Sequence, residues 1–186
     1  MSSEAMNMKA KDPPRKILLV DDEPEILDLL GDILKPICDE IITAENGLQA
    51  LAVLESNPDI SAILSDIQMP RMNGLELLSR IRSQFNPIPF VVLTAFGDSK
   101  SYQEAIRLNA TDFLEKPIVF KQLQLVMTRA IRYGVSVHQL NRSLDEVLAK
   151  EQIPAEISES IKRARRTVML MRIESSLYLQ KREKKN

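Results

Sequence analysis

The stretch from Lys16 to Ile37 reads KILLVDDEPEILDLLGDILKPI and decides the fold class. Its first part, residues 17–20, is a short apolar run typical of a strand that is buried on both faces. Its second part has the i, i+3, i+4, i+7 spacing of an amphipathic helix, with apolar residues at Ile26, Leu29, Leu30, Ile33, Leu34 and Ile37. Pro24 suits the first turn of that helix. The stretch therefore predicts a strand followed by a helix, with two acidic residues at the junction.

The same alternation recurs along the chain. Further strands are predicted at residues 40–43, 60–64, 89–93 and 111–114, and further helices at 46–55, from 73, at 99–108 and from 119. Two of these helices open with the spacing of a capping box, Asn46 with Gln49 and Asn73 with Glu76. Five strands alternating with five helices predict an α/β domain with a parallel sheet and helices on both faces.

Polar residues follow four of the five strands. Asp21 and Asp22 come after the first strand, Asp66 after the third, Thr94 after the fourth and Lys116 after the fifth. In such sheets these strand ends meet at one edge. Three carboxylates there would repel one another unless a divalent cation neutralised them, and oxygen ligands favour Mg²⁺, Mn²⁺ or Ca²⁺. An aspartate nucleophile, a metal, a lysine and a hydroxyl together predict a phosphoryl-transfer site.

Each of these residues also has an ordinary structural explanation. An Asp-Asp pair after a strand often caps the next helix. An Asp before Pro and Gly is often part of a turn, and a lone Lys before Pro is usually solvated. The functional interpretation depends on five placements that coincide at the strand ends in the right order.

Several motifs together resemble the receiver domain of response regulators, of the kind found in chemotaxis regulators. They are Ile17-Leu18-Leu19-Val20-Asp21-Asp22-Glu23, Asp66-Ile67-Gln68-Met69-Pro70-Arg71-Met72-Asn73-Gly74, Val92-Leu93-Thr94-Ala95 and Phe113-Leu114-Glu115-Lys116-Pro117. The resemblance covers residues ~16–130 and implies a five-stranded, doubly wound, flavodoxin-like fold with strand order 2-1-3-4-5.

The resemblance implies a role for each residue of the acidic set. Asp66 matches the phospho-acceptor. Asp22 matches the acid that binds the metal directly, and Asp21 matches its companion, which often acts through water. The main-chain carbonyl of Gln68 matches the third protein ligand of the metal, which is Mg²⁺ or Mn²⁺.

Other positions match the switch residues of the family. Thr94 matches the hydroxyl that turns toward the phosphoryl group, and Lys116 matches the lysine that pairs with it. Pro117 matches the proline that typically follows that lysine in a cis peptide bond. Phe113 occupies the aromatic switch position, which is often Tyr in relatives. Gln68 and Phe96 occupy the positions that tune the lifetime of the acyl phosphate.

The implied function is a two-component switch. It would accept a phosphoryl group from a sensor histidine kinase or a phosphotransfer protein and change its contacts with an output protein that the sequence does not identify. It would be a signalling phospho-acceptor that assists its own phosphorylation and dephosphorylation, and no separate enzyme. A phospho-aspartyl hydrolase is the enzyme alternative, but such enzymes often carry a second acid where this chain has Gln68.

The expected organisation has three parts: a disordered lead at residues 1–14, the receiver at 15–133 and a helical extension at 134–186. From Leu123 to Val147, apolar residues recur at intervals of three and four, which permits a coiled coil. A second helix is expected from Pro154 to about Lys181. We expect residues 123–131 to pack on the receiver body, because the last receiver helix must cover the sheet. Beyond Gly134 we expect a homodimer through the helices, with a partner protein or a hairpin folded back on the body as the alternatives. His138 faintly resembles a kinase phospho-acceptor, without the acidic neighbour and proline of that motif.

Composition narrows the function classes. Residues 1–119 carry 11 Lys+Arg and 19 Asp+Glu, a balance of -8, and residues 120–186 carry 14 and 7, a balance of +7. The chain lacks Trp and shows no convincing DNA-reading motif, so we do not expect nucleic-acid binding; a basic adaptor is the alternative. No membrane span or signal peptide is apparent, and we expect a cytoplasmic protein. Cys38, the only cysteine, is expected to be a buried, inert thiol.

Overall fold

Five parallel strands form one sheet in the order β2-β1-β3-β4-β5. The computed structural model of the chain describes residues 13–84, 86–95, 97–149, 154–160 and 163. The elements are β1 (Lys16–Val20), α1 (Pro24–Leu34), a 3₁₀ turn η1 (Lys35–Ile37), β2 (Glu40–Ala44), α2 (Gly47–Ser56), β3 (Ile60–Asp66), α3 (Gly74–Ser83), β4 (Phe90–Ala95), α4 (Ser99–Arg107), β5 (Asp112–Lys116) and α5 (Phe120–Leu148). The order and the alternation confirm the predicted doubly wound α/β fold.

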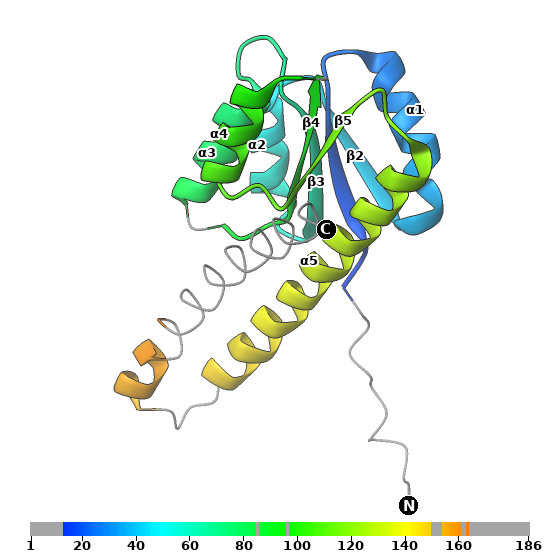
Figure 1. Cartoon of the computed structure of the whole chain (residues 1–186). Coiled ribbons are helices and arrows are strands. Elements are labelled where there is room, and N and C mark those ends of the chain that lie inside the picture. The colour runs from blue at the N-terminus through cyan, green and yellow to red at the C-terminus, as the bar shows by residue number, and fades with distance from the viewer. Residues whose placement is uncertain (1–12, 85, 96, 150–153, 161–162, 164–186) are drawn as a thin grey trace, which may run out of the picture.

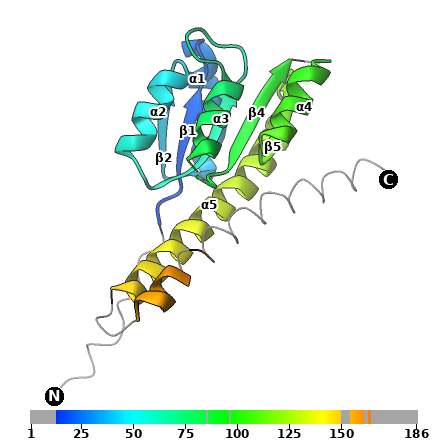
Figure 2. The same ribbon diagram turned by 90° about the vertical axis from the view of Figure 1, so that its left-hand side faces the viewer.

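Helices cover both faces of the sheet (Figures 1 and 2). One core cluster joins α2, α3 and α4 to one face, and the other joins α1 and α5 to the opposite face. Neighbouring residues of β3 divide between the two clusters, Ile63 in the first and Leu64 in the second, because successive side chains of a strand point to opposite faces. Cys38 is buried in the second cluster, and burial raises the pKa of its thiol.

The two predicted capping boxes differ in detail. In the first turn of α3, the Asn73 side chain accepts from the Glu76 backbone N–H, and the Glu76 carboxylate accepts from the Asn73 N–H. At α2, Asn46 accepts from the backbone of Leu48 and Gln49, but the Gln49 side chain accepts from Glu45 N–H. At α2 the Gln49 side chain therefore bonds to the residue before Asn46, one position earlier than a capping box predicts.

Helix α5 runs without a break for 29 residues, and its middle lies against the start of β3. A Cβ on Gly134 would collide with the backbone carbonyl of Ser61, so the helix approaches this closely only because glycine stands there. One turn later the His138 ring donates from Nε2 to the Ile60 carbonyl at 2.9 Å. Body packing therefore continues beyond residue 133, where the receiver was predicted to end, and that domain boundary stays a prediction.

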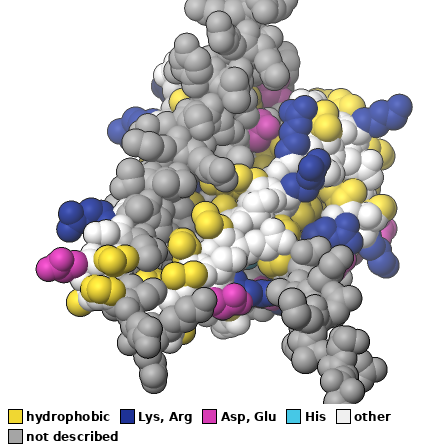
Figure 3. Space-filling model, turned by 90° about the horizontal axis from the view of Figure 1, so that it is seen from below, with side chains coloured by type: hydrophobic (Ala, Val, Ile, Leu, Met, Phe, Trp, Pro, Cys, Tyr) yellow, Lys and Arg dark blue, Asp and Glu magenta, His cyan; other side chains and the backbone are white. Residues whose placement is uncertain are grey.

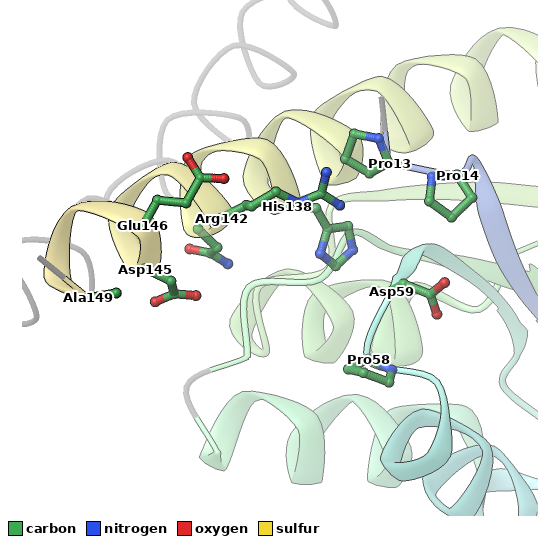
Figure 4. A pocket seen from close by; sticks show the side chains of 10 residues that line it. Pro13, Pro14, Pro58, Asp59, His138, Arg142, Asp145, Glu146 and Ala149 are labelled. Carbon is green, nitrogen blue, oxygen red and sulfur yellow. The ribbon is translucent and has the colours of Figure 1, made fainter. Parts of the chain in front are cut away.

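A pocket lies between this part of α5 and the loop that leads into β3 (Figure 4). His138 lines it from the helix, and Pro58 and Asp59 line it from the loop. Val137 beside His138 is buried, whereas Leu140 is 42% and Val147 39% exposed. The predicted apolar repeat of α5 thus divides into a half that packs on the body and a half that stands clear of it.

Two regions of the sequence analysis fall largely outside the described residues. They are residues 1–12 of the predicted lead and most of the second C-terminal helix. Of that helix, residues 154–160 and 163 are described, and 155–160 are helical. Within the described part of the chain, no helix combines the length and the apolar character that a membrane crossing requires.

Candidate functional site

Three acidic side chains meet at the carboxyl edge of the sheet. Asp21 and Asp22 follow β1, and Asp66 ends the adjacent strand β3. One carboxylate oxygen from each lies within 4.8 Å of those of the other two. Asp21 is fully buried and Asp66 is 7% exposed, while Asp22 faces solvent. The structure thus brings together the acids that the sequence singled out.

Lys116 supplies a positive charge to this cluster from β5. Its Nζ lies 3.1 Å from Oδ1 of Asp66 and 3.7 Å from Oδ2 of Asp21. Since β4 separates β3 from β5, the lysine side chain reaches across the end of one strand to make these contacts. One ammonium group faces three carboxyl groups, so the site holds an excess of negative charge when all of them are ionised.

Of the three acids, Asp21 has the environment least favourable to a negative charge. Its Oδ1 accepts a hydrogen bond from the Glu23 backbone N–H at 3.0 Å, but its buried Oδ2 has no hydrogen-bond partner. Burial raises the pKa of Asp21, with the charges of Asp66 and Asp22 acting in the same direction, and the Glu23 bond and Lys116 oppose the shift. A buried carboxylate oxygen with no donor is suited to a cation or to a cation-bound water.

The donor set therefore fits a hard divalent cation. All three side chains offer carboxylate oxygens, the ligands that Mg²⁺, Mn²⁺ and Ca²⁺ prefer. Gln68, the fourth predicted ligand, lies two residues beyond Asp66 in the β3–α3 loop with its side chain exposed. The part assigned to its main-chain carbonyl stays a prediction.

The loop that carries Gln68 returns closely upon the end of β3. Gly74 donates its backbone N–H to the Ile67 carbonyl at 3.0 Å. A Cβ at Gly74 would collide with the Asp66 carbonyl, so only glycine allows α3 to begin directly beside the acidic cluster. This close approach fixes where the chain leaves the sheet after Asp66.

The predicted switch residues lie at the ends of β4 and β5. Thr94 is buried, and its hydroxyl donates to the Ala95 carbonyl at 3.3 Å. Phe113 packs edge-on against Tyr102 of α4, with ring centroids 4.1 Å apart. The Lys116–Pro117 peptide bond is cis. Phe96 lies outside the described residues.

Two neighbours of the site were not predicted from the sequence. Tyr102 is one, because nothing in a helix of mixed composition indicates which of its residues meets β5. Ser65 is the other: it is fully buried and donates its hydroxyl to the Asp66 carbonyl at 2.8 Å. The sequence signal that could have identified Ser65 is a polar residue inside an otherwise apolar strand, directly before Asp66.

Comparisons with known proteins agree on the type of domain. Residues 17–128 match the family model of the response regulator receiver domain. A curated CpxR homolog, a transcriptional regulatory protein of Haemophilus influenzae, is 35% identical over 146 residues, 78% of this chain and 63% of the relative. The transcriptional regulatory protein FixJ of Bradyrhizobium diazoefficiens is 34% identical over 118 residues, 62% of this chain and 56% of the relative. The chain thus spans less than two thirds of the length of these curated relatives.

Solved structures resemble the same part of the chain. The receiver domain of NtrX from Brucella abortus is 36% identical, with a TM-score of 0.58 over 62% of this chain and 98% of that one. A response regulator receiver domain protein from Clostridium thermocellum is 28% identical, with a TM-score of 0.59 over 63% of this chain and 94% of that one.

Proposed function

Because this chain belongs to the response regulator receiver family of two-component signalling, we propose that Asp66 accepts a phosphoryl group from a histidine kinase or a phosphotransfer protein. The observation that carries the proposal is the position of Asp66. It ends the central strand, lies in contact with Lys116 at 3.1 Å and shares its edge of the sheet with two further acids. The protein acts as a phospho-acceptor that takes part in its own phosphorylation and dephosphorylation.

The reaction is a transfer between two nucleophiles. A carboxylate oxygen of Asp66 attacks the phosphorus of a phosphoimidazole, the P–N bond breaks, and the imidazole nitrogen leaves with its electron pair and takes up a proton. The product is an acyl phosphate on Asp66. Lys116 stays near Asp66 and pairs with a phosphoryl oxygen, which stabilises the negative charge that the transfer brings.

Asp21, Asp22, Asp66 and the carbonyl of Gln68 would hold the Mg²⁺ or Mn²⁺ ion. When bound, the ion neutralises charge on the acids and on the transferring group. The buried Oδ2 of Asp21 and the excess of acids over Lys116 support this assignment. Without a cation, two of the acids would also repel an incoming phosphate.

The switch begins at Thr94. Phosphorylation adds roughly -1.5 to -2 charge at Asp66, and this attracts the Thr94 hydroxyl away from the Ala95 carbonyl that it now contacts at 3.3 Å. The move changes the end of β4, next to β5 and its Phe113–Tyr102 contact with α4. Phosphorylation thereby biases the surface that these elements present to protein partners.

Intact-mass measurement after incubation with acetyl phosphate and Mg²⁺ tests the proposal. The wild type is expected to gain one phosphoryl group, which is lost on brief treatment with hydroxylamine because acyl phosphates are labile to it. Asp66→Ala should gain none, and Asp28→Ala, which removes an exposed acid of α1, should behave as the wild type does. Equal labelling of Asp66→Ala and the wild type would refute the assignment.

For the output, we propose a homodimer through the C-terminal helices. Hydrophobic side chains reach the surface in the view from below (Figure 3). On α5, Leu140 and Val147 are exposed and Leu144 is half-buried, at the spacing of a coiled-coil seam. Light scattering of the full chain with and without beryllofluoride and Mg²⁺ tests this. A monomer under both conditions at high protein concentration would contradict it.

A further inference from the structure

Strand β3 is buried along its whole length, yet it contains two serines. All seven residues from Ile60 to Asp66 are buried, and Ser61 and Ser65 have no exposed surface. A buried hydroxyl costs free energy unless it forms a hydrogen bond. Each serine forms one to a backbone carbonyl: Ser61 to Pro14 at 3.1 Å and Ser65 to Asp66 at 2.8 Å. The two bonds stand at opposite ends of the strand.

The bond of Ser65 lies at the point where β3 gives way to the functional loop. Its acceptor is the carbonyl of Asp66, the last residue of the strand. Gly74, the first residue of α3, crowds the same carbonyl, and a Cβ on Gly74 would also come within 3.0 Å of the Ser65 hydroxyl. The carbonyl is therefore held by a hydroxyl and by the start of a helix.

Holding this carbonyl orients the peptide plane between Asp66 and Ile67, because the six atoms of a peptide unit move together. That plane sets the direction of the chain toward Gln68, whose carbonyl is the proposed fourth ligand. A tilt of the plane would move this ligand relative to the carboxylates of Asp21 and Asp66. Groups that orient metal ligands from behind typically contribute about 10- to 100-fold to metal affinity.

We propose that Ser65 is a positioning residue: its hydroxyl fixes the Asp66 carbonyl and thereby aligns the β3–α3 loop for divalent cation binding. The proposal rests on the proposed function and adds a residue to it. An alanine at this position would leave the carbonyl without the hydroxyl donor.

The test compares Ser65→Ala with the matched control Ser61→Ala. Both changes remove one buried hydroxyl from the same strand, but only Ser65 bonds to the carbonyl of Asp66. Binding of Mg²⁺ and of Mn²⁺ is measured by titration calorimetry, since the chain has no Trp to report by fluorescence, and thermal unfolding is measured without metal. Ser65→Ala is expected to weaken cation binding about 10-fold, with Ser61→Ala close to the wild type.

If each buried hydroxyl contributed only to folding stability, Ser65→Ala and Ser61→Ala would both unfold at a lower temperature than the wild type. Their affinities for the cations would then be equal. That result, or an unchanged affinity in Ser65→Ala, overturns the proposal. Ser65→Cys, which keeps a weak donor in a slightly larger side chain, should have intermediate affinity and serves as the test if Ser65→Ala fails to fold. Failure of the wild type itself to bind either cation would overturn the proposed function, a different outcome from wild-type binding that Ser65 does not influence.

Discussion

Replacement of Asp21 by Asn should make the metal-free protein more stable and should reduce the stabilisation that Mg²⁺ provides. Asp21 is fully buried, its Oδ2 has no hydrogen-bond partner, and burial raises its pKa. An amide keeps the acceptor for the Glu23 N–H, removes the buried charge and can donate toward Asp66. The change therefore removes an electrostatic penalty together with a proposed metal ligand.

The size of the penalty follows from the geometry. At an effective dielectric constant of about 20, two charges less than 4.8 Å apart interact by about 3 to 4 kcal/mol. Asp21 experiences this repulsion from two carboxylates and a similar attraction from one ammonium group at 3.7 Å. Because Asp22 and Lys116 are partly in solvent, we discount the difference to about 2 kcal/mol. For a chain of this size that corresponds to an unfolding temperature about 4 to 8 °C higher.

The pH dependence carries a sign that can be checked. A raised pKa in the folded state means that the protonated Asp21 is the better tolerated form. Its favourable contribution is complete below the ordinary value of 3.8 and is lost as pH rises through the raised folded pKa. The advantage of Asp21→Asn over the wild type should therefore be full at neutral pH and shrink as the solution is acidified toward 3.8.

Thermal and urea unfolding with EDTA or with saturating Mg²⁺, at neutral and acidic pH, measure these effects. The wild type should gain about 2.7 kcal/mol at a Mg²⁺ concentration 100 times its Kd, and the variant much less. Asp28→Asn removes an exposed acid from α1 and should show neither effect. A variant that is less stable than the wild type in EDTA, or that gains as much from Mg²⁺, would refute the electrostatic account of the site.

Four further changes test other parts of the structure. Gly134→Ala should lower stability by about 2 kcal/mol or more in urea unfolding, because a Cβ there meets the backbone of β3, whereas Gly31→Ala has open space and should raise it by about 0.5–1 kcal/mol. Asn73→Ala removes the side-chain acceptor for the Glu76 backbone N–H in the capping box and should cost about 1 kcal/mol in the same assay; no loss would contradict the cap. Lys116→Met should weaken beryllofluoride binding in ¹⁹F NMR, since the acyl phosphate analogue on Asp66 loses its cationic partner; unchanged binding would count against that pairing.

The three inner strands, β1, β3 and β4, were predictable because they are buried along almost their whole length. The segment Ile17–Val20 is covered on both faces and is an unbroken apolar run in the sequence. In the helices between the strands, apolar residues instead recur every three or four positions. The same pattern placed Asp21, Asp66 and Lys116 at strand ends. Their mutual contacts then followed from the parallel order of the sheet.

What the sequence did not predict depends on distances that no local pattern encodes. A glycine inside a helix ordinarily weakens it, and nothing in the sequence around Gly134 indicates that α5 touches β3 there. Equally, the Asp21-Asp22 pair reads as two similar acids, yet one is fully buried and the other exposed. Such differences come from which way each side chain leaves the end of a strand, and they decide which acid bears the cost of desolvation.

Because α5 is a continuous helix, it fixes the direction in which any segment joined to its end points around the helix axis. The helix is 29 residues long, about 43 Å, and it is anchored to β3 near its middle, at Gly134 and His138. Each residue inserted between His138 and Leu148 would advance the helix end by about 1.5 Å and turn it by about 100°. An insertion of one residue would therefore turn the last turn of α5 to a very different direction. An insertion of seven residues would lengthen α5 further but leave its last turn pointing in nearly the original direction. In this protein the angular position of the end of the helix is set by residue count from one anchored turn.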